Sequence, residues 1–211
     1  MHKITSASLP KFAVALLAIL LPSLVFAHHA EFMRGHPLWQ GLSMPIHGVD
    51  HILFTIAVGM IAAQIGGRAL WGIPLLYTVA LVCGGILNIM GIGVPLLDYV
   101  ILASLVVCAA LLSWPLSASL LLTVGLVSLF TIFQGNDMIT PDNIVSNMPL
   151  FIAGCLVSSL VLLSIGIGLG LLILRFNTAL FRYASVFMLA AAVLIGTFPA
   201  LNNVVISLLE A

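Results

Sequence analysis

Six long apolar segments, separated by short connections, dominate this chain of 211 residues. Hydrophobic residues make up 63% of the sequence and charged residues only 6%, whereas a soluble domain typically carries about 25% charged residues. Each segment is close to the roughly 20 residues that a helix needs to cross a bilayer. Lipid offers no partner for unpaired backbone groups, so each span must be helical. The expected spans cover, to within several residues, 45–65, 71–90, 96–113, 116–134, 149–174 and 179–198.

The sequence therefore predicts an all-α, polytopic membrane protein of about six transmembrane helices, with the lipid bilayer as its first partner. No soluble domain interrupts the apolar segments. The longest polar connection is expected between Gln134 and Pro149.

The N-terminal 27 residues have the pattern of a cleavable signal peptide. Lys3 and Lys11 precede an apolar run at 12–21. Val25 and Ala27 satisfy the small-residue rule for the positions just before a cleavage site. Residues 1–27 would then be removed, and residues 28–211 would form a single transmembrane helical domain. An uncleaved first helix is the alternative, and in both cases residue 28 starts outside the cytoplasm.

Charged residues predict the orientation of the spans. With residue 28 outside, Arg68, Arg175 and Arg182 fall in cytoplasmic connections, where cationic residues are favoured; Arg34 is the exception. The acidic residues fall on the other side, namely Glu31, Asp50, Asp98, Asp137, Asp142 and Glu210. The sequence therefore predicts a bacterial inner-membrane protein whose mature N-terminus and C-terminus both face the periplasm.

Ionisable residues open the first span. All six histidines lie at or before residue 51, and Asp50 sits between His47 and His51. On a continuous helix these three residues occupy an arc of roughly 100°. Imidazole and carboxylate are a common ligand set for nickel, cobalt, zinc and iron, and ionisable residues inside a span are functional candidates by default. We therefore predict a metal site at Asp50, His51 and His47.

Two other interpretations of these residues stay open. Asp50 could accept the N–H of a ligating histidine and fix its tautomer rather than bind the metal itself. The pair could also be a structural ion pair that only holds helices together. The positive end of the helix dipole points at the site, so carboxylates from other helices would have to offset it.

Further donors could supplement this site. Asp98 and Asp137 lie at the outer ends of later spans, although Asp98 could equally mark the membrane edge. After cleavage, a free amine with His28 and His29 could chelate Ni(II) or Cu(II). Met44 lies close to the histidines along the chain.

The stretch "MPIHGVDHILFTIAVGMIAAQIGGRALWGIPL" resembles the HupE/UreJ family of hydrogenase and urease accessory proteins. That family has a cleaved signal, about six spans and an H-P-x-x-G-x-D-H motif that opens the first span. The matching positions are Pro45, Gly48, Asp50, His51, Val58, Gly59, Gly66, Gly67, Arg68 and Trp71. The resemblance implies passage of nickel, or of cobalt, across the inner membrane to supply metalloenzyme maturation.

The chain is a divergent member by this comparison. The first histidine of the family motif falls on Met44, and a second His-rich cluster is replaced by "FQGNDM", which includes Gln134 and Met138. A histidine common in the fifth span falls near Ser164. Either the site uses other donors, with Met44 and Met138 suited to Cu(I), or the protein is a non-transporting accessory or assembly subunit of a metalloenzyme or membrane complex.

Enzymes and nucleic-acid binders are disfavoured. The sequence carries no G-x-S-x-G, H-E-x-x-H or phosphate-loop pattern, so we expect no catalytic residues. A net charge of zero argues against nucleic acid as a partner. We also expect no permanent cofactor, only a metal ion that is bound or transported. Because the sequence shows no nucleotide site, transport would be driven by a gradient or would be a passive permeation step.

Overall fold

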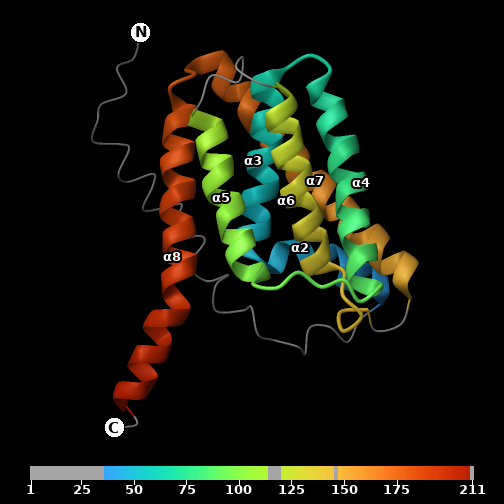
Figure 1. The fold of residues 1–211 in the computed structure, drawn as a ribbon. Helices are drawn as coiled ribbons and strands as arrows, with labels where there is room; N and C mark the ends of the chain where they lie inside the picture. Colours follow the sequence, from blue (N-terminus) through green and yellow to red (C-terminus); the bar gives the residue numbers. More distant parts are fainter. Residues whose placement is uncertain (1–35, 114–119, 145–146, 210–211) are drawn as a thin grey trace.

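A computed structural model describes residues 36–113, 120–144 and 147–209, with side chains as far as Thr197. The expected signal peptide, His28 and His29 lie outside these residues. The described residues form seven helices and no strand, which confirms the all-α prediction (Figure 1). The helices are α2 (Pro37–His47), α3 (Val49–Ile65), α4 (Ala69–Ile89), α5 (Leu97–Ser113), α6 (Leu120–Met138), α7 (Met148–Phe176) and α8 (Leu180–Leu209).

Several of these helices can cross a membrane. Within the described residues, α4, α6, α7 and the Leu180–Thr197 part of α8 are long and apolar enough to do so. Helices α2 and α3 pass the same test only as a bent pair, and α5 has 17 residues. The structure is therefore that of a multi-pass helical membrane protein with four to five such spans, and six spans stays a prediction.

The first expected span, 45–65, is wrong as a single helix. The chain breaks at Gly48, whose backbone is extended (φ −93°, ψ 114°), and α2 and α3 meet at an angle of 81°. Pro45 lies inside α2 and has no N–H to continue a helical ladder. His47 therefore does not share a helix face with Asp50 and His51.

Close backbone contacts at glycines hold the bundle together. A Cβ on Gly59 of α3 would lie 2.3 Å from the Leu163 carbonyl oxygen of α7, and one on Gly135 of α6 would lie 2.0 Å from the Leu81 carbonyl oxygen of α4. Small residues let membrane helices approach in this way. Gly41 of α2 makes a similar contact with α7, so α7 crosses both halves of the bent pair.

Helix α6 is longer at its C-terminal end than expected. The segment from Gln134 to Met138, predicted as the start of a polar connection, is the last turn of α6. Gln134 and Asn136 are each 1% exposed. Polar residues can stay helical and buried here because α4 and the α4–α5 connection supply hydrogen-bond partners to Asn136. This turn carries Asp137 toward α3.

The charged residues in the described part of the chain separate to two ends of the bundle. The carboxylates lie at the end formed by α2, the start of α3 and the ends of α4 and α6, whereas the arginines lie at the opposite end (Figure 1). The carboxylates are Asp50, Asp98, Asp137 and Asp142, and the arginines are Arg68, Arg175 and Arg182.

Candidate functional site

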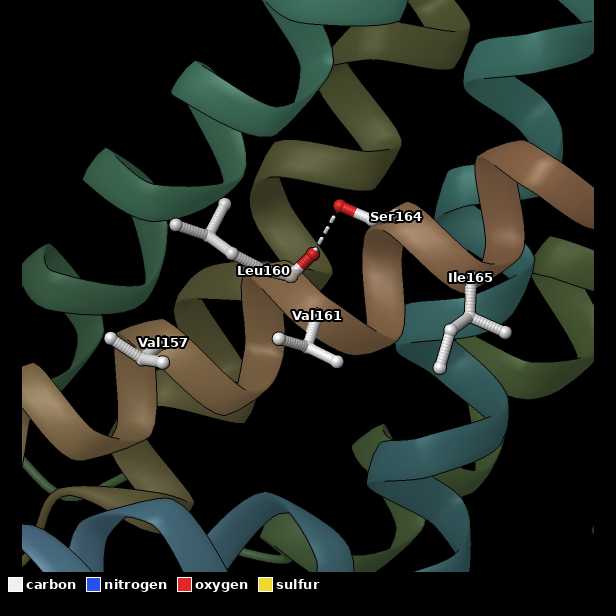
Figure 2. A pocket seen from close by; sticks show the side chains of 5 residues that line it. All are labelled: Val157, Leu160, Val161, Ser164 and Ile165. Atoms are coloured by element: carbon white, nitrogen blue, oxygen red, sulfur yellow. Dashed lines mark hydrogen bonds between the residues drawn. The ribbon is translucent and has the colours of Figure 1, made fainter.

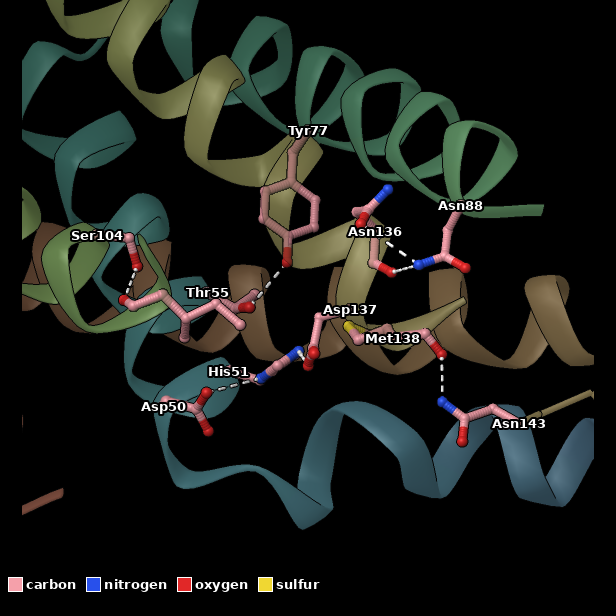
Figure 3. A network of polar contacts seen from close by, with 11 residues as sticks. Asp50, His51, Thr55, Tyr77, Asn88, Ser104, Asn136, Asp137, Met138 and Asn143 are labelled. Carbon is pink, nitrogen blue, oxygen red and sulfur yellow. Dashed lines mark hydrogen bonds and ion pairs between the residues drawn. The ribbon is translucent and has the colours of Figure 1, made fainter. Parts of the chain in front are cut away.

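His51 lies between two carboxylates from different helices. Its Nδ1 is 3.2 Å from Oδ2 of Asp50, the preceding residue of α3, and its Nε2 is 3.4 Å from Oδ2 of Asp137 on α6. Figure 3 shows the imidazole ring with one carboxylate on each side. Since Nε2 forms no hydrogen bond of good geometry, the contact with Asp137 is electrostatic. We call Asp50, His51 and Asp137 the imidazole–carboxylate cluster.

The cluster opens toward one end of the bundle. The His51 side chain is 8% exposed, whereas the side chains of Asp50 and Asp137 are 24% and 35% exposed. A cation arriving from the solvent would therefore meet the carboxylates before the imidazole.

Two helix ends meet at the cluster with opposite dipoles. Asp50 lies in the first turn of α3, where a carboxylate is favoured by the positive end of the helix. Asp137 lies at the end of α6, where the negative end favours a cation. The negative end of α6 therefore counteracts the positive end of α3, which alone would disfavour a cation.

The cluster is not a closed coordination shell in this conformation. Among the described residues, no three His, Cys, Asp or Glu side chains are placed together so that they could hold a metal ion. The reason is visible in the cluster itself, because the two carboxylates face opposite edges of one ring.

Three of the other expected donors lie within the described residues but outside the cluster. His47 is exposed at the end of α2, where its Nδ1 donates to the Ser43 carbonyl oxygen at 2.6 Å. Met44 is half-buried and packs against the apolar core. Asp98 is exposed in the first turn of α5 and lies within electrostatic range of Asp137.

The turn that replaces the family's second cluster has mixed roles. Asn136 is structural, because its side chain donates to the carbonyl oxygens of Gly84 and Ile92 at 3.2 and 3.0 Å and accepts from Asn88 at 3.3 Å. These bonds tie α6 to the end of α4 (Figure 3). Gln134 differs, since its buried amide has no hydrogen-bond partner in the described chain.

Ser164 does not face the cluster. It is exposed on α7 and donates to the Leu160 carbonyl oxygen at 2.7 Å. Figure 2 shows it in an apolar surface groove with Val157, Val161 and Ile165. Ser164, near which the resemblance predicts a histidine, is therefore part of the outer surface.

Sequence reasoning missed one pair of buried hydroxyls. Thr55 Oγ1 of α3 and Tyr77 Oη of α4 lie 2.9 Å apart and are 1% and 2% exposed (Figure 3). The available signal was that Thr55 follows His51 by four residues, which places both on one helix face.

Gly48 makes room for the cluster, which gives a first prediction. A Cβ at this position would lie 2.8 Å from Asp50 Oδ1 and 2.9 Å from His51 Nδ1. Both contacts are side-chain ends, so Gly48→Ala is expected to displace the cluster while the bundle stays folded. We expect a weaker metal affinity, by about tenfold or more as for other changes in ligand orientation, measured by isothermal titration with Ni(II).

Gly72→Ala is the matched control, because no atom lies within 4 Å of a Cβ at that position. Equal affinities for the two variants would show that Gly48 does not position the cluster.

Two comparisons with known proteins give matches to this chain. A family model described as "HupE / UreJ protein" matches residues 15–195. The protein named "Protein HupE" from Rhizobium leguminosarum bv. viciae is 31% identical over 169 residues, which cover 80% of this chain and 86% of that relative. No solved structure gives a significant match.

Proposed function

Because the chain belongs to the HupE/UreJ family, we propose that it is a metal permease or metal-delivery protein of the bacterial inner membrane. Its cargo would be a divalent transition-metal ion, nickel first and cobalt second, which supports maturation of a metalloenzyme. No catalytic residue takes part in this function, and the ion is cargo rather than a permanent cofactor.

The imidazole–carboxylate cluster is the observation that carries the proposal. An arriving ion would displace the Nε2 proton of His51 to solvent and bind Nε2 and Asp137 Oδ2, which lie 3.4 Å apart, in place of their electrostatic contact. Asp50 would keep Nδ1–H as its partner and so hold the ring and its tautomer, as carboxylates do for metal-binding histidines. His47, Asp98 and Met44 would act around this mouth, and His28 and His29 would extend it if the chain begins there after cleavage.

The two charged ends of the bundle support the proposed orientation of the protein in the membrane. Arginines favour the cytoplasmic side. The opposite end of the bundle, which carries the cluster and the other described carboxylates, would then face the periplasm. The mature N-terminus and C-terminus would then also be periplasmic. Capture would occur where the protein meets incoming metal.

The donors in the cluster favour nickel and cobalt over Cu(I). A carboxylate with an imidazole suits Ni(II) and Co(II), whereas Cu(I) prefers thioether and thiolate ligands. Met138 is buried next to Asp137 in the chain, and Met44 packs on the core. Copper is therefore the second metal class to test.

Uptake of metal by whole cells tests the proposal. Cells that express the protein should accumulate radiolabelled Ni(II) or Co(II) in a saturable manner above cells with an empty vector. Accumulation of copper alone would change the cargo. Uptake of none of the three metals at verified membrane abundance would refute the permease.

A second function is favoured by one specific observation. The turn at the end of α6 supplies no imidazole, and Asn136 is fully engaged in tying α6 to α4. A non-transporting accessory subunit that assembles with a metalloenzyme would need no second imidazole cluster. Affinity purification that yields a stoichiometric metalloenzyme, from cells without metal uptake, would support this function.

A further inference from the structure

Three buried side-chain hydroxyls, each from a different helix, lie close together one turn along α3 from His51. Thr55 belongs to α3, Tyr77 to α4 and Ser159 to α7, and their exposed fractions are 1%, 2% and 1%. Thr55 and Tyr77 share a hydrogen bond of 2.9 Å. Ser159 Oγ lies close enough to influence the Tyr77 hydroxyl, but no hydrogen bond of good geometry forms. We call these three side chains the hydroxyl triad.

The hydroxyl triad lies further into the bundle than the imidazole–carboxylate cluster. Thr55 follows His51 by four residues on the same face of α3, which is about 6 Å along the axis. The Thr55 and Tyr77 hydroxyls face each other in Figure 3, one step from His51 along α3. Phe54 lies beside this pair, with its ring centroid 6.5 Å from that of Tyr77, and the thiols of Cys108 and Cys155 lie within electrostatic range of the Tyr77 hydroxyl.

Among the other buried hydroxyls of the bundle, Ser185 of α8 also bonds across helices, to Ser113 of α5, whereas three others bond within their own helix. Ser104 donates to Ile101, Thr131 to Val127 and Ser158 to Gly154, in each case to a carbonyl oxygen of its own helix. This is the usual way in which a membrane helix satisfies such a side chain. Thr55 and Tyr77 instead bond across helices, and Ser159 Oγ forms no hydrogen bond of good geometry within the described residues.

We propose that Thr55, Tyr77 and Ser159 form a second oxygen station for the divalent cation on its way from His51 through the bundle. The inference rests on the proposed function, since it concerns the same ion. A cation that leaves His51 inward must exchange its ligands for other oxygen atoms, because an apolar interior solvates charge poorly. The hydroxyl triad offers three such oxygens, one from each of three helices.

Uptake kinetics with matched variants test the station. Tyr77→Phe and Thr55→Val each remove one hydroxyl and keep the shape, so the maximal rate of Ni(II) uptake should fall about tenfold, as for one lost polar contact in a barrier. Metal affinity of the purified protein should stay unchanged, because the cluster is intact. Thr55→Ser should restore the rate.

Thr131→Val is the control, because it removes a hydroxyl that is 0% exposed and bonded to its own helix. Wild-type uptake rates in both Tyr77→Phe and Thr55→Val would overturn the station and leave the proposed function standing. Failure of Thr55→Ser to restore the rate would overturn it as well. If the wild type moves neither nickel nor cobalt, the proposed function fails, and the station fails with it.

Discussion

Replacing His51 with alanine is expected to abolish saturable metal uptake. The substitution removes the only buried imidazole in the described part of the chain and leaves Asp50 and Asp137 without the group that lies between them. Asp50→Asn should reduce uptake by roughly 10- to 100-fold, the range found when the partner of a metal-binding histidine is lost. The measurement is initial-rate uptake of radiolabelled Ni(II), normalised to protein in the membrane.

Asp142→Asn is the control for the loss of a carboxylate. Asp142 is exposed in the connection after α6, at the same end of the bundle as the cluster. Its substitution should leave the uptake rate near that of the wild type. A comparable loss in Asp142→Asn would show that general negative charge at this end, rather than the cluster, determines uptake.

Gly135→Val is expected to prevent stable folding. Any Cβ at this position would lie 2.0 Å from the Leu81 carbonyl oxygen, and this contact is with backbone that cannot move aside like a side chain. Helices α4 and α6 would have to separate, which would cost about 3 kcal/mol or more as for severe overpacking. Asn136, whose bonds to α4 depend on this contact, would lose its partners too.

Thermal unfolding in detergent, followed by size-exclusion chromatography, measures this effect. Gly125→Val on the same helix is the control, because nothing lies within 4 Å of a Cβ there. A Gly135→Val protein as stable and abundant as Gly125→Val would contradict the close contact between α4 and α6.

The residues of the cluster could be predicted individually, but their pairing could not. Asp50 and His51 stand out as ionisable residues at the start of an apolar segment. Asp137 stands out as a carboxylate that follows a later apolar segment. That one imidazole lies between both carboxylates depends on how α3 and α6 pack. The expected helix face shared with His47 is absent because the helix breaks at Gly48.

Two polar residues show how local patterns misassign roles. Asn136 has the composition of a connection, yet α4 supplies its partners, so it stays buried and helical. Tyr77 gives no signal in an apolar segment, because its importance comes from Thr55 on another helix.

The sequence alone determined that this chain is helical and suited to a membrane, and at which end its charges gather. Each of these properties follows from contributions that are local and that add along a segment: transfer of side chains into lipid, satisfaction of backbone hydrogen bonds, and charge in the connections. The tertiary structure decided the bend at Gly48, the pairing of His51 with Asp137 and the convergence of three hydroxyls. These depend on which helices approach closely, and that is set by contacts such as Gly59 on Leu163 and Gly135 on Leu81 between segments far apart in the chain.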